Sequence, residues 1–394
     1  MNRSTITLIA CMILMAMLGS VFVFPIFLAP WEEMLGAFRA EVSSILSVSM
    51  IAATVGLFIG HRVYQRVSPP IFTATVCLVS AVGIVLSGWG TSVLPLWIGY
   101  GLLFGGANGI GYGFTIQVAA QALPGRKGFA IGITAASYAA GMGLSPPLMS
   151  AALDVGGISA AMNWLAVTFI ATGILVATLL RYSGATFTPE PRSEEMKPVK
   201  GANGTEAVLW LGYGAGAAAG VMAIGHSAGI VAAAGGDAAF AGPAVNASGY
   251  MLGGLLAGWL ADRFSVRTLL SALPLLTAVV LLLLAQGGSV NYVLGCLAMI
   301  GFSYGALVVA YPTAVVHYFG ILSAGRIYGR VCISWGFAGF LAPWFAGYLF
   351  DQSGGYNTAL TVAAGTAVAS ALAVRMLPKT GVTDGMAPVT ETPS

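Results

Sequence analysis

Uncharged polar side chains that can form hydrogen bonds lie inside several long apolar segments of this 394-residue sequence. Asn108 and Tyr112 are four residues apart, so in a helix they occupy the same face. The full set comprises Asn108, Tyr112, Tyr138, Asn246, Tyr250, Tyr304 and Trp335. Amide, hydroxyl and indole groups can hold a carboxylate or a hydroxylated solute, and the alternative is that each bonds a facing helix. We predict that these residues bind a small-molecule substrate.

His226 is the main titratable side chain within the apolar segments, in the sequence GVMAIGHSAG. Ionisable residues inside a membrane are costly and usually face a cavity, and an imidazole changes charge near neutral pH. We therefore predict that His226 takes part in substrate binding and carries a coupling proton. The alternative is a neutral imidazole that bonds a neighbouring backbone or hydroxyl group.

The composition identifies the elements that must position these residues. The chain is 58% hydrophobic and 7% charged, whereas soluble domains are roughly 25% charged. A hydrocarbon core of about 30 Å requires about 20 apolar residues per helix, so the sequence predicts an all-α membrane protein with twelve transmembrane helices. The predicted spans are 5–29, 43–61, 70–89, 93–119, 128–150, 158–181, 207–233, 240–260, 268–286, 291–316, 328–350 and 356–377.

The positive charges define an orientation for these spans. Of the sixteen Lys and Arg residues, fifteen fall on one side when the chain is threaded from an inside N-terminus, and Arg39 falls on the other. Cationic residues near span ends stay on the cytoplasmic side during insertion. We predict a multi-pass protein of the inner (cytoplasmic) membrane with both termini in the cytoplasm. The net charge of +3 reflects these anchoring residues, and we expect no nucleic-acid partner.

The chain divides into two halves that resemble each other. A polar stretch between the sixth and seventh spans, ATFTPEPRSEEMKPVKGANGTE, has little to bury and predicts a flexible linker. The divisions are a six-helix bundle over 1–181, a cytoplasmic linker over 182–206, a second six-helix bundle over 207–377 and a cytoplasmic tail over 378–394. Residues 197 positions apart match in the two halves, among them Pro146 with Pro343 and Asp154 with Asp351. Parallel repeats of this kind allow two bundles to rock around a central site.

A charged motif follows the predicted span 240–260. In GWLADRFSVR, Gly258 precedes Asp262, Arg263 and Arg267. A carboxylate at a helix end can bond the first amides of the next helix and a neighbouring arginine, and so hold one face closed. We predict that Asp262, Arg263 and Arg267 form a conformational latch. The motif resembles the loop that marks the major facilitator superfamily, and GHRVYQR in the first half resembles a degraded copy of it.

Longer stretches resemble narrower families within that superfamily. The region 19–51 looks like the first two helices of the monocarboxylate transporter and oxalate:formate antiporter families, notably at Phe38, Arg39, Glu41, Val42 and Ser43. LPGRKGFAIGI is similar to their loop before the fifth helix, and the region 319–356 is similar to their tenth to twelfth helices. The resemblance implies the major facilitator fold and secondary transport of a small organic anion, often with a proton or a counter-anion.

Two positions depart from the pattern of these families. An arginine commonly stands four residues before the motif glycine and binds the substrate carboxylate bidentately, but this position is Gly254. The middle of the span 328–350 also lacks the lysine expected of oxalate carriers. These departures argue against oxalate or another dicarboxylate. The resemblance still predicts a small organic anion, a monocarboxylate, as the substrate. The missing arginine and the aromatic content favour the alternative, carriage or export of a neutral or lipophilic solute.

Other functional classes make different demands on the sequence. A membrane sensor that binds solute without moving it is a second alternative, although the linker and tail are short for a signalling domain. No nucleophile–base pair or paired carboxylates are visible within the spans, so we do not expect an enzyme. The four cysteines show neither CxxC spacing nor a nearby histidine, so we expect no metal site, and no cofactor is implied. We expect a monomer.

Overall fold

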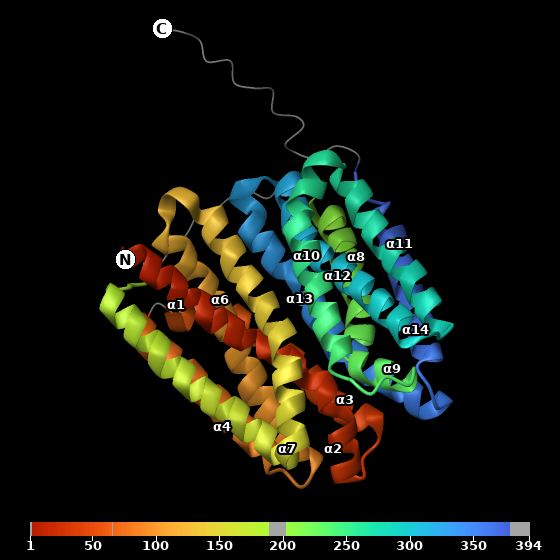
Figure 1. Ribbon diagram of the computed structural model, residues 1–394. Helices are drawn as coiled ribbons and strands as arrows, with labels where there is room; N and C mark the ends of the chain where they lie inside the picture. The colour runs from red at the N-terminus through yellow and green to blue at the C-terminus, as the bar shows by residue number, and fades with distance from the viewer. Residues whose placement is uncertain (1, 65, 189–201, 379–394) are drawn as a thin grey trace.

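The computed structural model describes residues 2–64, 66–188 and 202–378. Of a few residues inside helices, among them Asp262, it describes the backbone but not the side chain. Helices account for nearly all of these ranges, and none of the described residues forms a strand. The helices of the first and second halves of the chain form two groups that lie side by side (Figure 1). The prediction of an all-α protein is confirmed. The linker predicted over 182–206 and the tail predicted over 378–394 lie largely outside the described residues.

The first half forms the group drawn from red to yellow-green in Figure 1. Its elements are α1 (Arg3–Gly19), η1 (Ser20–Ile26), α2 (Leu28–Leu35), α3 (Arg39–Tyr64), α4 (Pro69–Gly88), α5 (Val93–Leu96), η2 (Trp97–Phe104), α6 (Gly105–Ala122), η3 (Pro124–Arg126) and α7 (Lys127–Ser183). Helix α7 is interrupted at Gly156 and Gly157, where the backbone is not helical and Gly157 adopts a φ of +67°. The chain reverses direction there, so α7 comprises two antiparallel segments (Figure 1).

The second half forms the group drawn from green to blue. Its elements are α8 (Ala202–Ile224), α9 (Ser227–Ala233), α10 (Ala241–Arg263), α11 (Val266–Ala285), α12 (Val290–Phe319), α13 (Ile321–Ser353) and α14 (Asn357–Val374). A short break at Gly225 and His226 separates α8 from α9. Because α9 continues after only two residues, His226 sits at a joint within one interrupted helix.

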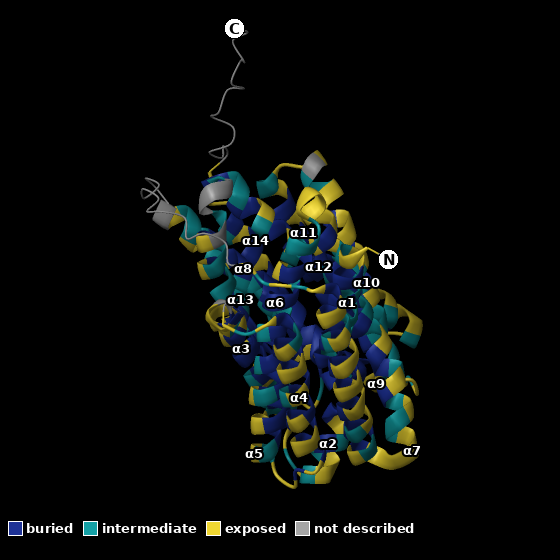
Figure 2. Cartoon of the chain, turned by 90° about the vertical axis from the view of Figure 1, so that its left-hand side faces the viewer, coloured by how far each residue is buried: buried dark blue, intermediate teal, exposed yellow. Residues whose placement is uncertain are grey.

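Ten helical stretches of the described residues are long and apolar enough to cross a membrane. One of the ten includes both segments of α7, and the 23-residue α10 is not among them. The structure therefore supports a multi-pass membrane protein, while the number of twelve spans stays a prediction. Exposed residues lie along the outer faces of the helices and buried residues lie between them (Figure 2), as expected for a bundle surrounded by lipid.

The start of α1 and the end of α14 lie towards the same face of the bundle, which we call the terminal face (Figure 1). In the first half, Thr7 near the start of α1 donates a hydrogen bond to the Ser183 hydroxyl at the end of α7, over 2.9 Å. In the second half, the Arg267 guanidinium donates to the carbonyl oxygen of Arg375, just beyond α14. The opposite face carries the start of α3, and we call it the Arg39 face.

Glycines allow the helices within each half to approach closely. A Cβ atom at Gly141 of α7 would lie 1.8 Å from the carbonyl oxygen of Ala16 in α1. A Cβ atom at Gly253 of α10 would lie 1.9 Å from the carbonyl oxygen of Phe302 in α12. Small residues at such crossings stabilise helix pairs in lipid, where apolar side chains gain nothing by leaving the acyl chains. The high glycine content thus serves close packing.

We expect Gly253→Ala to destabilise the protein by about 1–3 kcal/mol, because the added methyl group overlaps the backbone of α12. The measurement is the thermal midpoint of unfolding in detergent. Gly365→Ala in α14 is the matched control, because no heavy atom lies within 4 Å of its Cβ position. Equal midpoints for the two variants would contradict the packing role assigned to Gly253.

Candidate functional site

Three of the predicted residues meet in the first half. The Asn108 amide in α6 donates to the carbonyl oxygen of Leu18 over 2.5 Å, and its side-chain oxygen accepts from the Tyr138 hydroxyl of α7 over 3.3 Å. The rings of Tyr112 and Tyr138 pack edge to face, with centroids 5.3 Å apart. Asn108 therefore links α6 to α1 and also orients the Tyr138 hydroxyl.

Three more meet in the second half. The indole N–H of Trp335 in α13 donates to the hydroxyl of Tyr304 in α12 over 2.7 Å. The ring of Tyr250 in α10 lies 5.9 Å from that of Tyr304. A Tyr–Trp pair of this kind satisfies the indole donor, which is a requirement for buried tryptophan.

The two groups of three lie together where the halves face each other. The Tyr250 hydroxyl is close enough to those of Tyr112, Tyr138 and Tyr304 to interact electrostatically. Trp335 packs against the apolar cores of both halves. The resulting central cluster consists of Asn108, Tyr112, Tyr138, Tyr250, Tyr304 and Trp335. All six side chains are uncharged, so the cluster offers hydrogen-bonding groups and aromatic faces.

Three further residues of this neighbourhood were not predicted from the sequence. The ring of Phe22 in η1 packs edge to face on Tyr138, with centroids 6.3 Å apart. Tyr328 and Cys332 of α13 interact with the hydroxyls of Tyr250 and Tyr112, respectively. A usable signal was present, because residues 328, 332 and 335 have the i, i+4, i+7 spacing of one helix face.

Asn246 lies apart from the contacts of the central cluster. Its side chain is 1% exposed and donates to the carbonyl oxygen of Leu297 over 3.0 Å. This bond links α10 to α12. It matches the alternative to substrate binding, in which the polar side chain bonds a facing helix. The substrate-binding role of Asn246 stays a prediction.

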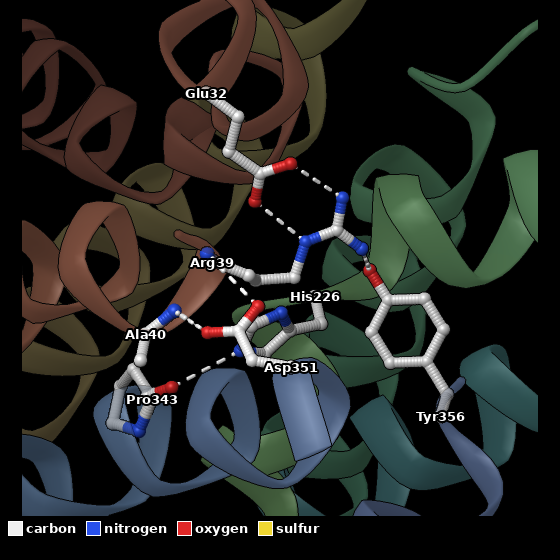
Figure 3. A network of polar contacts seen from close by, with 7 residues as sticks. All are labelled: Glu32, Arg39, Ala40, His226, Pro343, Asp351 and Tyr356. Atoms are coloured by element: carbon white, nitrogen blue, oxygen red, sulfur yellow. Dashed lines mark hydrogen bonds and ion pairs between the residues drawn. The ribbon is translucent and has the colours of Figure 1, made fainter. Parts of the chain in front are cut away.

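A second polar site lies at the Arg39 face, and Figure 3 shows it from close by. The Arg39 guanidinium binds both carboxylate oxygens of Glu32, with N–O distances of 2.6 and 2.7 Å. It also donates to the Tyr356 hydroxyl and covers the ring of Phe350, 3.9 Å from the centroid. Arg39 and Glu32 belong to the first half, whereas Tyr356 and Phe350 belong to the second. The guanidinium therefore bridges the two halves.

Asp351 strengthens the same bridge through the backbone. Its carboxylate accepts from the amides of Arg39 over 3.1 Å and of Ala40 over 2.8 Å, at the first turn of α3 (Figure 3). The first amides of a helix have no partner within the helix and carry partial positive charge, so a carboxylate is well suited to them. Glu32, Arg39, Asp351 and Tyr356 together form what we call the Arg39 cluster. The sequence analysis noted Arg39 and Asp351 without assigning them to a site.

His226 adjoins the Arg39 cluster rather than the central cluster. Its Nε2 atom lies 3.1 Å from the carbonyl oxygen of Pro343 in α13, and its ring centroid lies 5.7 Å from that of Tyr356 (Figure 3). The side chain is 1% exposed, and Nδ1 has no hydrogen-bond partner among the described residues. The backbone bond expected for a neutral imidazole is thus present, with the Nε2 proton donated to Pro343.

Close contact between the halves continues along α3 and α13 from the Arg39 cluster. Cβ atoms at Gly347 and Gly339 of α13 would lie 2.8 Å from the Cα of Ala40 and the Cβ of Met50, respectively. Between them, the amide of Trp344 donates to the Ser47 hydroxyl over 3.2 Å. At Gly329, nearer the terminal face, no heavy atom lies within 4 Å of the Cβ position. Along α3 and α13, the contact between the halves is therefore closer near the Arg39 face than at Gly329.

Comparison with known proteins places this geometry in a functional class. No family model matches the sequence. An oxalate:formate antiporter of Oxalobacter formigenes is 27% identical over 398 residues, which cover 95% of this chain and 91% of that protein. An uncharacterized MFS-type transporter of Escherichia coli (strain K12), YhjX, is 23% identical over 84% of each chain. The chain is thus similar in sequence to transporters over nearly its full length.

Solved structures show the same architecture. A POT family transporter in complex with 5-aminolevulinic acid superposes with a TM-score of 0.77 at 11% identity, over 94% of this chain and 95% of that one. A bacterial homologue of the human lysosomal transporter Spinster, inward-facing and occupied, gives 0.73 at 16% identity, over 97% and 98%. The chain therefore shares the fold of these transporters, and its sequence is similar to that of major facilitator-type transporters over nearly its full length. The prediction that it is not an enzyme is confirmed.

The predicted latch lies at the terminal face of the transporter. The Arg263 guanidinium stacks over the ring of Trp259, 4.2 Å from the centroid, and Arg267 bonds the backbone beyond α14. The side chain of Asp262 lies outside the described part of the structure, so the latch stays a prediction. At the same face, Arg330 of α13 binds both oxygens of Glu206 in α8, over 2.5 and 2.6 Å.

We expect Asp351→Asn to loosen the first turn of α3 in this transporter. The asparagine side chain keeps one acceptor oxygen, but its NH₂ group replaces the second carboxylate oxygen and is itself a donor facing the backbone N–H groups of α3. About 1.5–3 kcal/mol of charge-assisted hydrogen bonding is therefore lost. Hydrogen–deuterium exchange at residues 39 and 40 should become about tenfold faster. Asp154→Asn is the matched control, because Asp154 occupies the repeat-related position and is exposed. Unchanged exchange in Asp351→Asn would contradict the capping role.

Proposed function

We propose that the transporter is a secondary active carrier of a small organic anion, with a monocarboxylate as its substrate, working by alternating access. The supporting observation is the central cluster, in which six predicted polar side chains from α6, α7, α10, α12 and α13 meet between the two halves. A site placed between two repeats can be exposed to either side when the halves rock. The proposal fits the likeness to a protein named as an oxalate:formate antiporter.

In this proposal the central cluster recognises a carboxylate through neutral donors. The hydroxyls of Tyr112 and Tyr250 can each donate one hydrogen bond to an anionic oxygen, and Tyr138 can do so when its hydroxyl turns away from Asn108. Hydrogen bonds to a charged acceptor are worth about 1.5–3 kcal/mol, more than those between neutral groups. Several such donors compensate in part for the arginine that is replaced by Gly254. A monocarboxylate needs fewer hydrogen-bond donors than a dicarboxylate, so a site with few donors favours a monocarboxylate.

The membrane orientation in the proposal follows the positive charges. Fifteen Lys and Arg residues then lie on the cytoplasmic side with both termini, and Arg39 lies outside. The Arg39 cluster accordingly closes the outer side in the conformation described above. Opening that side requires the separation of Asp351 from the amides of α3 and of Arg39 from Tyr356.

We propose that His226 carries the coupling proton and that its protonation acts on the Arg39 cluster next to it. The charged and titratable groups that face this region are Glu32, Arg39, Asp351 and Tyr356. A proton on Nδ1 would place a second positive charge near Arg39 and favour separation of the halves. Protonation would thus promote opening to the outside, and deprotonation would promote closing.

A neutral solute is a second candidate substrate. The observation that favours it is that every side chain of the central cluster is uncharged, and the aromatic rings of Tyr112, Tyr138 and Tyr304 suit an apolar surface. If no proton moved with it, a neutral solute would be carried without dependence on membrane potential, and in either case without dependence on the charge of a carboxylate.

Uptake into proteoliposomes separates these candidates. We expect labelled lactate, pyruvate or acetate to accumulate when an inward proton gradient is imposed, and Tyr304→Phe to lower the rate about tenfold, because the Trp335 indole loses its acceptor. The double variant Tyr304→Phe/Trp335→Phe, which removes the indole donor as well, should be less impaired in binding than Tyr304→Phe. Failure of every carboxylate to accumulate, with uptake of an uncharged analogue, would select the neutral-solute candidate.

His226→Gln tests the proton assignment. The glutamine amide can still donate to the Pro343 carbonyl but does not titrate, so we expect folding and exchange without a gradient to persist while gradient-driven accumulation is lost. The measurement is accumulated substrate against imposed pH difference. His317→Gln is the control and should retain accumulation. If His226→Gln also retains it in full, the coupling proton travels elsewhere.

A further inference from the structure

An apolar groove with a volume of about 320 Å³ runs between α3, α4 and α6, away from both polar clusters. Val63 of α3 and Val67 just beyond it form one end, and Val76, Val79, Leu102 and Leu103 form the walls. Among the lining residues, Thr75 has the one polar side chain, and its hydroxyl bonds the carbonyl oxygen of Ile71 over 2.9 Å. The groove therefore presents no free hydrogen-bonding group from a lining side chain.

Gly106 keeps this groove open. No heavy atom lies within 4 Å of its Cβ position, whereas a Cβ at Gly109, one turn later, would lie 1.9 Å from the carbonyl oxygen of Ala53. Close helix packing explains Gly109 but does not explain Gly106. The preceding segment η2 is π-helical, and such segments are frequent at functional sites. The empty volume beside Gly106 is thus shaped by the backbone.

Two arginines stand at the end of the groove near the terminal face. Arg62 and Arg66 are the chain neighbours of Val63 and Val67, are four residues apart, and are both exposed. Positive charge at the bilayer interface attracts anionic lipid head groups, and long arginine side chains can reach that interface from a helix end. An apolar channel with cationic residues at one end is complementary to a molecule with an acyl chain and an anionic head.

We propose that this groove is a binding site for an anionic glycerophospholipid, with one acyl chain beside Gly106 and the phosphate held by Arg62 and Arg66. The charge complementarity selects the head group, and the walls of valine and leucine select the chain. The site lies in the first half and does not depend on which solute is carried.

Native mass spectrometry of the full-length, delipidated protein tests the proposal with added dioleoyl phosphatidylglycerol or phosphatidylcholine. We expect the wild type to bind the anionic lipid about tenfold more tightly, because phosphatidylglycerol has a net negative charge, whereas the choline cation of phosphatidylcholine offsets its phosphate next to the two arginines. The surface variant Arg62→Gln/Arg66→Gln should bind both lipids equally. Gly106→Leu should weaken binding of both about tenfold by filling the groove, because each buried methylene contributes to lipid affinity.

Two matched controls make the result specific. The variant Arg126→Gln/Lys127→Gln removes two exposed charges beyond α6. The variant Gly365→Leu adds a large side chain at a glycine outside the groove that also has space around its Cβ position. Both variants should leave the lipid preference unchanged. Equal binding of the two lipids by the wild type, or equal loss in the control charge variant, would overturn the proposal. Full displacement of phosphatidylglycerol by an equal concentration of oleate would assign the groove to a single-chain acid and overturn the phospholipid assignment.

Discussion

The carboxylate of Asp351 completes the first turn of α3 from the opposite half of the molecule. Phe38, the residue before α3, has no polar side-chain group that could accept from the first amides of the helix. Asp351 accepts from two of them, so when the halves separate at this face the start of α3 must exchange a carboxylate for water. The position of Arg39, and with it the salt bridge to Glu32, depends on that contact.

The burial of the Arg39 cluster makes it a contact with two discrete states. The side chains of Arg39 and Glu32 are 12% and 19% exposed, so both charges have lost most of their water. A buried pair gains little net stability over apolar packing, but removing one partner leaves an uncompensated charge. Partial separation is therefore costly, while full separation restores hydration to every member. Such a contact favours closed and open arrangements over intermediate ones.

Sequence alone predicted the fold class and most of the central cluster, because both follow from local properties. Hydrophobicity identifies helices, and polar residues such as Asn108 and Tyr304 stand out at mid-depth. The Arg39 cluster was not predicted, because Asp351 lies 312 residues from Arg39 and nothing in either segment specifies their antiparallel pairing. For His226, the titratable group was identified from sequence, but its neighbours depend on the helix break and on the exposed carbonyl at Pro343.

Internal repetition explains the turn that carries Asp351 but not its role. Gly157 and Gly354 are 197 residues apart and both adopt a positive φ, +67° and +70°, but their ψ angles are −166° and 13°. A glycine-dependent turn therefore follows both Asp154 and Asp351, with a different backbone geometry in each half. The counterpart of Arg39 at this offset is Gly236, which cannot supply a guanidinium. The two halves therefore share the glycine at the turn, while the contact of Asp351 with the first amides of α3 joins the second half to the first. The counterparts of Glu32 and Tyr356 at the same offset are Gly229 and Ser159. The groups that surround the Arg39 guanidinium are therefore not repeated in the other half.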